Sequence, residues 1–96
     1  MSPGRNTHRA DLNQHAIVTA LRQLGMSVQI LSQTGSGCPD VLVGHAHENI
    51  LLEIKQPKGV LSAIQILWHK AWRGQVAVVR TVDEAIAAIN KRVRGR

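Results

Sequence analysis

Two carboxylates and a lysine are spaced so that a hairpin would bring them together. Short aliphatic runs at 41–43 and 50–52 flank a polar tip, which is the pattern of an antiparallel β-hairpin with a loop of about four residues. If the strands pair symmetrically about the tip, Asp40 lies opposite Glu53, and directly opposed residues point to the same side of a sheet. The period of two along a strand adds Lys55 to that side. The sequence therefore places two acids and an ammonium group at one end of the hairpin.

This pairing of acids indicates a bound cation. Two carboxylates directly across a sheet repel each other unless a positive charge lies between them. The chain has only six acidic residues, so two of them facing each other is unexpected. Mg²⁺ binds through one or two carboxylates and leaves its other positions to water and phosphate oxygens. A divalent cation on Asp40 and Glu53, with Lys55 beside it, has the composition of a metal-dependent site that cleaves phosphodiester bonds.

The same residues resemble a known nuclease motif. Pro39-Asp40, followed after twelve residues by Glu53-Ile54-Lys55, looks like the PD-(D/E)xK motif. The likeness covers about residues 11–89 and points to one branch of that superfamily, the virus-type replication-repair nuclease (VRR-NUC) domain, which often stands alone in phage and prophage proteins. The segments that carry it are 37–44, 51–55, Leu61-Ser62, Gln65 and Trp68-His69.

The resemblance implies both a fold and a reaction. The fold is a restriction-endonuclease-like α/β sandwich in the order αβββαβα, around a central four-stranded mixed sheet. Mg²⁺ or Mn²⁺ would be held by Asp40, Glu53 and the backbone carbonyl of Ile54, with Lys55 and Gln65 completing the catalytic group. The reaction would be endonucleolytic hydrolysis of DNA in phage replication, recombination or repair. Small domains of this family are similar to Holliday-junction resolvases, which make two symmetric cuts, so branched DNA and a homodimer are expected.

The residues alone predict the same order of elements. Helical spacing over 11–24 ends at Gly25, alternation over 26–31 predicts a strand, and the hairpin follows. A helix over 62–73 should bury a stripe of Ile64, Leu67, Trp68 and Ala71, because aliphatics on both faces of the hairpin indicate a sheet covered on both sides. The run 76–79 should pair in parallel with 50–55 through a right-handed crossover, before a last helix that begins with the capping box at 81–84.

Two residues each have two interpretations. Asp11 either caps the first helix and complements its dipole, or, as the resemblance implies, joins the metal site from that helix. Position 14 carries Gln and cannot supply a carboxylate there. Gln65 completes a capping box that starts at Ser62, which would make it structural. The resemblance instead turns Gln65 toward the active site, where it would contact Lys55, substrate or metal-bound water.

Charge and composition favour a polyanionic partner. The net charge is +6 and the pI is about 10.8, which predicts salt-dependent binding to nucleic acid. With two Trp and no Phe or Tyr, aromatic platforms for stacking bases are not expected. Contacts to phosphate are assigned to Lys58, His69, Lys70, Arg5 and Arg9, although a solvated surface explains these side chains equally well. The alternative function is a non-catalytic basic nucleic-acid-binding module whose acids are structural.

The chain is expected to form one domain with basic ends. Residues 1–10 are assigned to a flexible basic arm, 11–90 to the nuclease domain and 91–96 to a basic tail. A single cysteine excludes an internal disulfide and fits a reducing compartment. No apolar stretch has the length of a signal or membrane segment, so a cytoplasmic location is expected, as for a phage or prophage protein in a bacterial host.

Overall fold

The element order is the predicted αβββαβα. The computed structural model describes residues 3–94, with side chains described from Leu12 onward. Its elements are α1 (Pro3–Gln23), β1 (Ser27–Ile30), β2 (Val41–His45), β3 (Glu48–Ile54), α2 (Ala63–Ala71), β4 (Val76–Val79) and α3 (Val82–Arg94). No helix in this described part of the chain is both long and apolar enough to cross a membrane.

The four strands form one mixed sheet in the order β1-β2-β3-β4. β1 pairs with β2 and β2 with β3 in antiparallel fashion, whereas β3 and β4 are parallel because the chain returns through α2 between them. The hairpin of β2 and β3 has the symmetric register that the sequence predicts, with Val41 opposite Leu52 and Val43 opposite Ile50. This register sets which residues share a face of the sheet, and thereby where the two acids point.

The hairpin tip is shorter than the loop of about four residues that was expected. His45 still pairs with Glu48, so only Ala46 and His47 make the turn. Both have positive φ, at 52° and 65°, which is the backbone of a type I′ turn. The turn lacks the Asn-Gly or Asp-Gly pair that usually announces this geometry, which explains why the sequence pattern predicted a longer loop.

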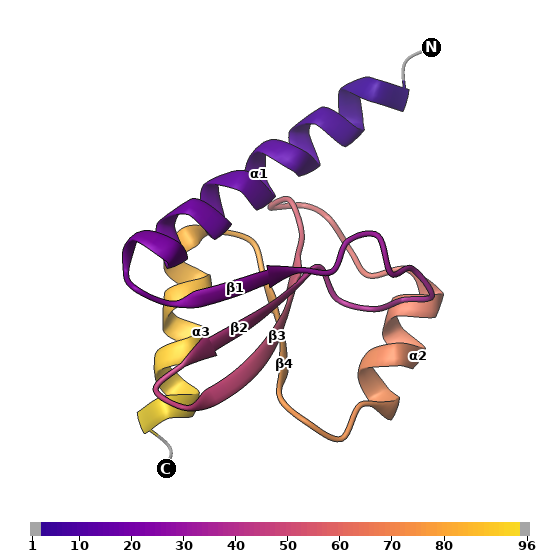
Figure 1. Cartoon of the computed structure of the whole chain (residues 1–96). Helices are drawn as coiled ribbons and strands as arrows, with labels where there is room; N and C mark the ends of the chain where they lie inside the picture. The colour runs from indigo at the N-terminus through magenta and orange to yellow at the C-terminus, as the bar shows by residue number, and fades with distance from the viewer. Residues whose placement is uncertain (1–2, 95–96) are drawn as a thin grey trace.

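The hydrophobic core lies on one side of the sheet. Figure 1 shows α1 and α3 against this side and α2 on the other. Apart from the pair His45 and Glu48 at the hairpin tip, the alternate residues of β2 and β3 that point toward α1 and α3 are aliphatic, and they meet the apolar stripes of the two helices. The buried core consists of Ile17, Val18, Leu21, Met26, Val41, Val43, Ile50, Leu52, Val79, Ala85 and Ile89.

The opposite side of the sheet is covered less completely than predicted. No residue of α2 is fully buried, and Ile64 and Leu67 are 60% and 67% exposed, so the predicted buried stripe is wrong except at Trp68. The half-buried Trp68 and the neighbouring His69 face inward, instead of Ile64 and Leu67. α2 therefore approaches the sheet through a few large side chains rather than through a packed aliphatic face.

Both terminal helices are longer than predicted. α1 begins at Pro3 rather than near Asp11, so residues 3–10 are helical and not an irregular arm; proline fits the first turn of a helix because its φ is already helical. The N-terminal end of α1 extends beyond the sheet (Figure 1). α3 continues to Arg94, and Val93 packs against the core, so the residues from 91 to 94 belong to the helix and not to a tail.

Candidate active site

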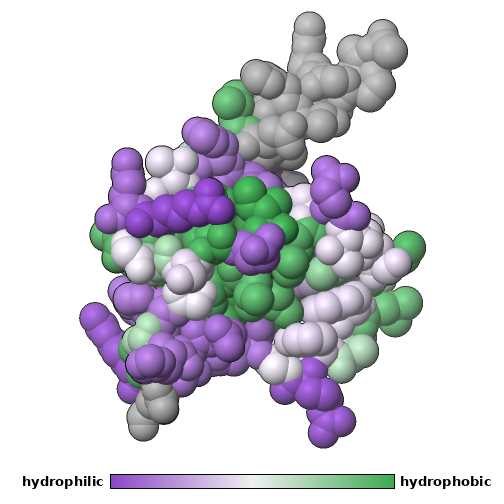
Figure 2. Space-filling view, in the orientation of Figure 1, coloured by the Kyte–Doolittle hydropathy of each residue, from purple (hydrophilic) through white to green (hydrophobic). Residues whose placement is uncertain are grey.

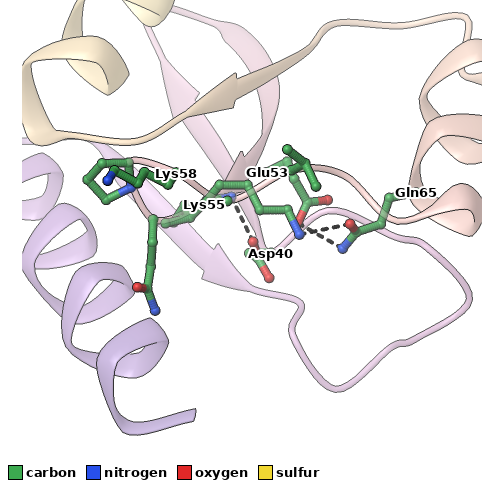
Figure 3. Close-up of a pocket in the computed structure, with 10 residues that line it drawn as sticks. Asp40, Glu53, Lys55, Lys58 and Gln65 are labelled. Carbon is green, nitrogen blue, oxygen red and sulfur yellow. Dashed lines mark hydrogen bonds between the residues drawn. The ribbon is translucent and has the colours of Figure 1, made fainter. Parts of the chain in front are cut away.

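Asp40 is held between β1 and β3, directly before β2. Its backbone N–H donates to the carbonyl of Leu52 at 3.1 Å, and its own carbonyl accepts from the N–H of Leu31 at 2.7 Å. Carboxylate Oδ2 accepts the backbone N–H of Ile54 at 2.7 Å, as Figure 3 shows. Bonds on three sides therefore fix the backbone and the side chain of Asp40 at the end of the hairpin.

Glu53 is a buried acid next to Asp40. It lies on β3 with a relative exposure of 1%, although glutamate is a residue type that is almost never fully buried without a partner. Burial raises the pKa of the Glu53 carboxyl to about 8, with further increases from the charge of Asp40 and a hydrogen bond between the two side chains; Lys55 acts in the opposite direction. In the absence of a cation, Glu53 therefore keeps its proton at neutral pH.

Gln65 combines both of its predicted roles. The hydroxyl of Ser62 accepts the N–H of Gln65 at 3.2 Å, and Gln65 Oε1 accepts the N–H of Ser62 at 2.9 Å, which completes the capping box of α2. The same Oε1 accepts a hydrogen bond from Lys55 Nζ at 2.8 Å, and Nε2 donates to Glu53 Oε2 at 3.3 Å. Both partners of the oxygen are donors and the partner of the nitrogen is an acceptor, so the chemistry of the contacts fixes the orientation of the amide.

The carboxylates and one backbone carbonyl face the same space. The N–H and C=O of a strand residue point to the same side, and the N–H of Ile54 points to Asp40. The carbonyl of Ile54 therefore also lies on the Asp40 side, while the N–H of Lys55 turns away to Val79 O at 3.0 Å. Carboxylate and carbonyl oxygens are the ligands that suit Mg²⁺ and Mn²⁺. Asp40, Glu53 and Ile54 are thus a donor set that fits the expected metal, with a buried acid whose ionisation a cation would favour.

His69 lies beside the acids and not on an open phosphate-binding surface. Its Nε2 is 3.4 Å from Glu53 Oε1, and the side chain is half-buried. Burial, and then the charge of Lys55, lower the pKa of the imidazole, which favours the neutral ring. His69 is therefore part of the same polar cluster as Glu53, and its contact with phosphate stays a prediction.

Two residues position the site without having been predicted from the sequence. Asn13 of α1 donates through Nδ2 to the carbonyl of Lys55 at 3.0 Å and to that of Arg80 at 3.3 Å, which ties the ends of β3 and β4 to the helix. Gly37 has φ of +85°, and a Cβ there would lie 2.8 Å from the carbonyl oxygen of Ile64. The loop before Asp40 thus packs directly on the first turn of α2, the turn that carries Gln65. The sequence features that could have pointed to these two residues are an amide side chain on the first helix and a glycine just before the motif.

The remaining predicted residues are placed as follows. Lys58 is exposed and lines the pocket with Asp40 and Glu53, further along the chain from Lys55 (Figure 3), whereas Lys70 is exposed on α2. The side chains of Arg5, Arg9 and Asp11 lie outside the described residues. Gln14 accepts the hydroxyl of Ser32 at 3.0 Å and thus contacts the loop after β1.

Cys38 is not activated as a nucleophile. Burial, followed by the charges of Glu53 and Asp40, raises the pKa of its thiol. A raised pKa favours the thiol over the reactive thiolate. Cys38 is therefore a small, half-buried packing residue rather than a candidate nucleophile.

The acids open into a surface pocket of about 780 Å³. Its walls come from Asp40, Glu53 and Gln65 together with the segment 54–60. Figure 3 shows Lys55 reaching between Asp40 and Glu53 toward Gln65. A search of protein-family models, of curated proteins and of solved structures finds no match to this chain. The functional argument therefore depends on the chemistry of this pocket.

Proposed function

We propose that the protein is a Mg²⁺- or Mn²⁺-dependent DNA endonuclease of the PD-(D/E)xK type, similar to VRR-NUC domains. The observation that carries this proposal is the buried Glu53 beside Asp40. Two acids in contact, one of them almost without exposure, are an unfavourable arrangement unless a proton or a cation neutralises them. The carbonyl of Ile54 and the open pocket add further oxygen ligands and room for a phosphate.

The reaction would use the chain's own groups as follows. Asp40, Glu53 and the Ile54 carbonyl would hold the cation, which would supply a water of lowered pKa and offset charge on the phosphate. Lys55 would place its ammonium group near the phosphate oxygens as negative charge develops on them, an effect that a partly buried site strengthens. Gln65 orients this ammonium group, because its Oε1 is the hydrogen-bond acceptor of Nζ.

The substrate would be DNA with branched structure, cut in the cytoplasm of a bacterial host during phage replication, recombination or repair. A net charge of +6 supports a polyanionic substrate. The described residues of one protomer contain one such group of acids, and resolving a four-way junction takes two symmetric cuts, so a twofold homodimer is the expected state. Sedimentation at micromolar concentration tests the dimer, and a preference for four-way over linear DNA tests the substrate.

A cleavage gel with EDTA, Mg²⁺ and Mn²⁺ lanes tests the reaction itself. Wild-type protein should cut junction DNA only with a divalent cation, and Asp40→Ala should abolish cutting while leaving the circular dichroism spectrum unchanged. Asp83→Ala, which removes an exposed acid from the first turn of α3, is the control for general acid loss. Unchanged nicking by a pure Asp40→Ala preparation contradicts the assignment of the site. Shifted but uncut DNA in every lane favours the non-catalytic binding module.

A further inference from the structure

A second pocket lies on the same face of the sheet as the acids. Along β2 and β3, residues two apart point the same way, so Leu42 shares the face of Asp40 and Leu51 shares the face of Glu53. This is the face that α2 leaves partly open. A pocket of about 650 Å³ fills the opening, and its walls include Cys38, Leu42, Leu51, Trp68, Trp72 and Gln75. Figure 2 shows a hydrophobic patch in the middle of the view, over the strands.

Two stacked indole rings form one wall of this pocket. Trp68 and Trp72 lie with ring centroids 4.7 Å apart and planes 16° from parallel. Trp72 is 46% exposed although one face of its ring lies on Trp68. A Cβ on Gly74 would meet Trp72 Nε1 at 2.9 Å, so the glycine leaves room for the ring in this position. The two rings form a stack that a third flat ring can extend, although the composition predicted no aromatic platform for stacking bases.

The chemistry of the pocket suits a nucleobase. Its floor is apolar, and its walls also include the hydroxyls of Thr34 and Ser36 and the carboxamide of Asn49, which offer hydrogen bonds to the edge of a heterocycle. Gln75 adds only its amide oxygen, because its Nε2 donates to Glu48 and to the carbonyl of Asn49. Arg73 is exposed and directly follows Trp72 in the chain, whereas Lys70 is two residues from each tryptophan and so lies on the opposite side of α2. An aromatic stack with a neighbouring cationic side chain is the composition of sites that bind unpaired nucleotides.

The spacing along the strands connects this pocket to the acids. Two residues on a strand span about 6.6 Å, so the aliphatic floor at Leu42 and Leu51 begins that far from Asp40 and Glu53. A stacked DNA strand rises about 3.4 Å per nucleotide. The pocket therefore lies within roughly two nucleotides of a phosphate held at the acids. His69 links the two sites, because its ring contacts Glu53 and lies edge-on to Trp68 at a centroid distance of 6.0 Å.

We propose that this pocket receives an unpaired base of the strand that is cut, from a nucleotide next to the scissile phosphate. The inference depends on the proposed function and names its substrate class: DNA with unpaired nucleotides at the cut site, such as a flap, a branch point or a bulge. A base in intact duplex is paired and stacked, and it enters a pocket only at the cost of extrusion. A preference for DNA with unpaired bases then follows from the pocket of one protomer, whereas the proposed preference for four-way junctions depends on the dimer.

Metal-free binding separates this inference from catalysis. In EDTA, a duplex with a branch of three thymidines is compared with the same duplex whose branch carries three abasic residues, so that the phosphates are matched and only the bases differ. Anisotropy of a labelled strand gives each Kd. Fluorescence of Trp68 and Trp72, the only two tryptophans in a chain without tyrosine, reports direct stacking. Wild-type protein should bind the thymidine branch roughly 5- to 140-fold more tightly, as expected for base–aromatic stacking, and that branch alone should quench the fluorescence.

The variants identify the surface involved. Trp72→Ala should reduce the preference for thymidine over abasic branches to near unity, and Trp72→Leu, which keeps apolar volume but no flat ring, should do the same. Leu67→Ala is the matched control, since this exposed residue of α2 does not line the pocket, and it should keep the wild-type preference.

Each outcome decides one of the two proposals. Equal binding of both branches by wild-type protein, without quenching, overturns the base pocket whether or not the protein cuts DNA with Mn²⁺. Retained preference in both Trp72 variants also overturns it. A third outcome is that wild-type protein shows no base preference and sediments as a dimer, while Trp72→Ala sediments as a monomer. This result identifies a second copy of the chain as the occupant and overturns the inference. Base preference without any metal-dependent cleavage supports the pocket and contradicts the nuclease.

Discussion

Replacing Glu53 by glutamine tests the cation site through stability, independently of catalysis. Glutamine keeps the shape of the side chain and a hydrogen-bond acceptor for Gln65, but it removes the negative charge. In the metal-free protein, the pKa of Glu53 is about 8 in the folded state against 4.5 in an unperturbed carboxyl. The folded protein therefore binds a proton that the unfolded chain releases. The resulting stabilisation is complete below about pH 4.5 and is lost as the pH rises through about 8.

The comparison with Glu53→Gln isolates this contribution. His69 acts in the opposite sense: the pKa of its imidazole is lowered in the folded state, so it makes folding more favourable as the pH rises. The pH dependence of the wild-type protein alone is therefore ambiguous. In EDTA, the unfolding free energy of wild type minus that of Glu53→Gln should fall steadily from pH 5 to pH 8. The variant is therefore expected to gain stability relative to wild type toward the alkaline end. A flat difference contradicts the buried, proton-binding state of Glu53.

The cation should reverse the order of the two proteins. A ligand at a hundred times its Kd stabilises the folded state by about 2.7 kcal/mol. For a domain of 96 residues, each kcal/mol corresponds to about 4–8 °C in Tm, so Mg²⁺ or Mn²⁺ at that excess should raise the wild-type Tm by about 10–20 °C. Glu53→Gln should lose most of this increase. Since Glu53 is largely protonated at pH 7, wild-type protein should also release close to one proton per bound cation.

Melting curves followed by circular dichroism, and calorimetric titrations in two buffers of different ionisation enthalpy, measure these quantities. Glu84→Gln is the matched control, because this exposed glutamate of α3 accepts the Arg80 N–H at 2.8 Å, and glutamine can accept the same bond. Its metal-dependent increase in Tm should equal that of wild type. Equal increases in wild type and Glu53→Gln, or binding without proton release, would refute the assignment of Glu53 as a metal ligand.

Three further predictions concern residues that position the site. Gly37→Ala should lower both Tm and cleavage more than Gly35→Ala, since both glycines have positive φ but only the Cβ at Gly37 meets the backbone of α2; equal effects contradict the packing argument. Ser62→Ala should cost about 1 kcal/mol of stability and retain cleavage, whereas Gln65→Ala should lose both the cap and the activity. Full cleavage by Gln65→Ala would exclude a role of this residue in the site. Asn13→Asp should destabilise by about 1–3 kcal/mol and reduce activity, because a carboxylate repels the two carbonyls that the amide bridges, and an unchanged melting curve would show that this bridge is not needed.

The sequence predicted those parts of the fold that follow from local pattern. The register of the hairpin was predictable because the two aliphatic runs are symmetric about their tip, and a strand's period of two then brings Asp40 and Glu53 to one side. The two interpretations of Gln65 were both readable, but the sequence could not show that one carboxamide satisfies them together. That result depends on where the capped turn of α2 lies relative to Lys55, which is a matter of tertiary packing.

The parts that were not predictable depend on long-range contacts. The aliphatic stripe of α2 predicts burial by periodicity, yet Ile64 and Leu67 are exposed because the helix approaches the sheet through Trp68 and His69. The stack of Trp68 and Trp72 is a local contact that composition misses but spacing indicates, because the two residues are four apart within the helix predicted over 62–73. That the stack lines a pocket depends on how α2 lies against the sheet. The hydrogen bonds of Asn13 reach the carbonyls of Lys55 and Arg80, which lie 42 and 67 residues further along the chain.

The attachment of α2 has a consequence for how the protein responds to heat. This helix buries no side chain completely, and the amide that begins it is the same one that holds the lysine ammonium group and the buried acid. Fraying of its first turn therefore separates the proposed catalytic groups while the sheet and its aliphatic core remain folded, since elements with few buried contacts open before the core does. On warming, cleavage should be lost several degrees below the melting temperature. Bound DNA that contacts α2 should bring these two temperatures together.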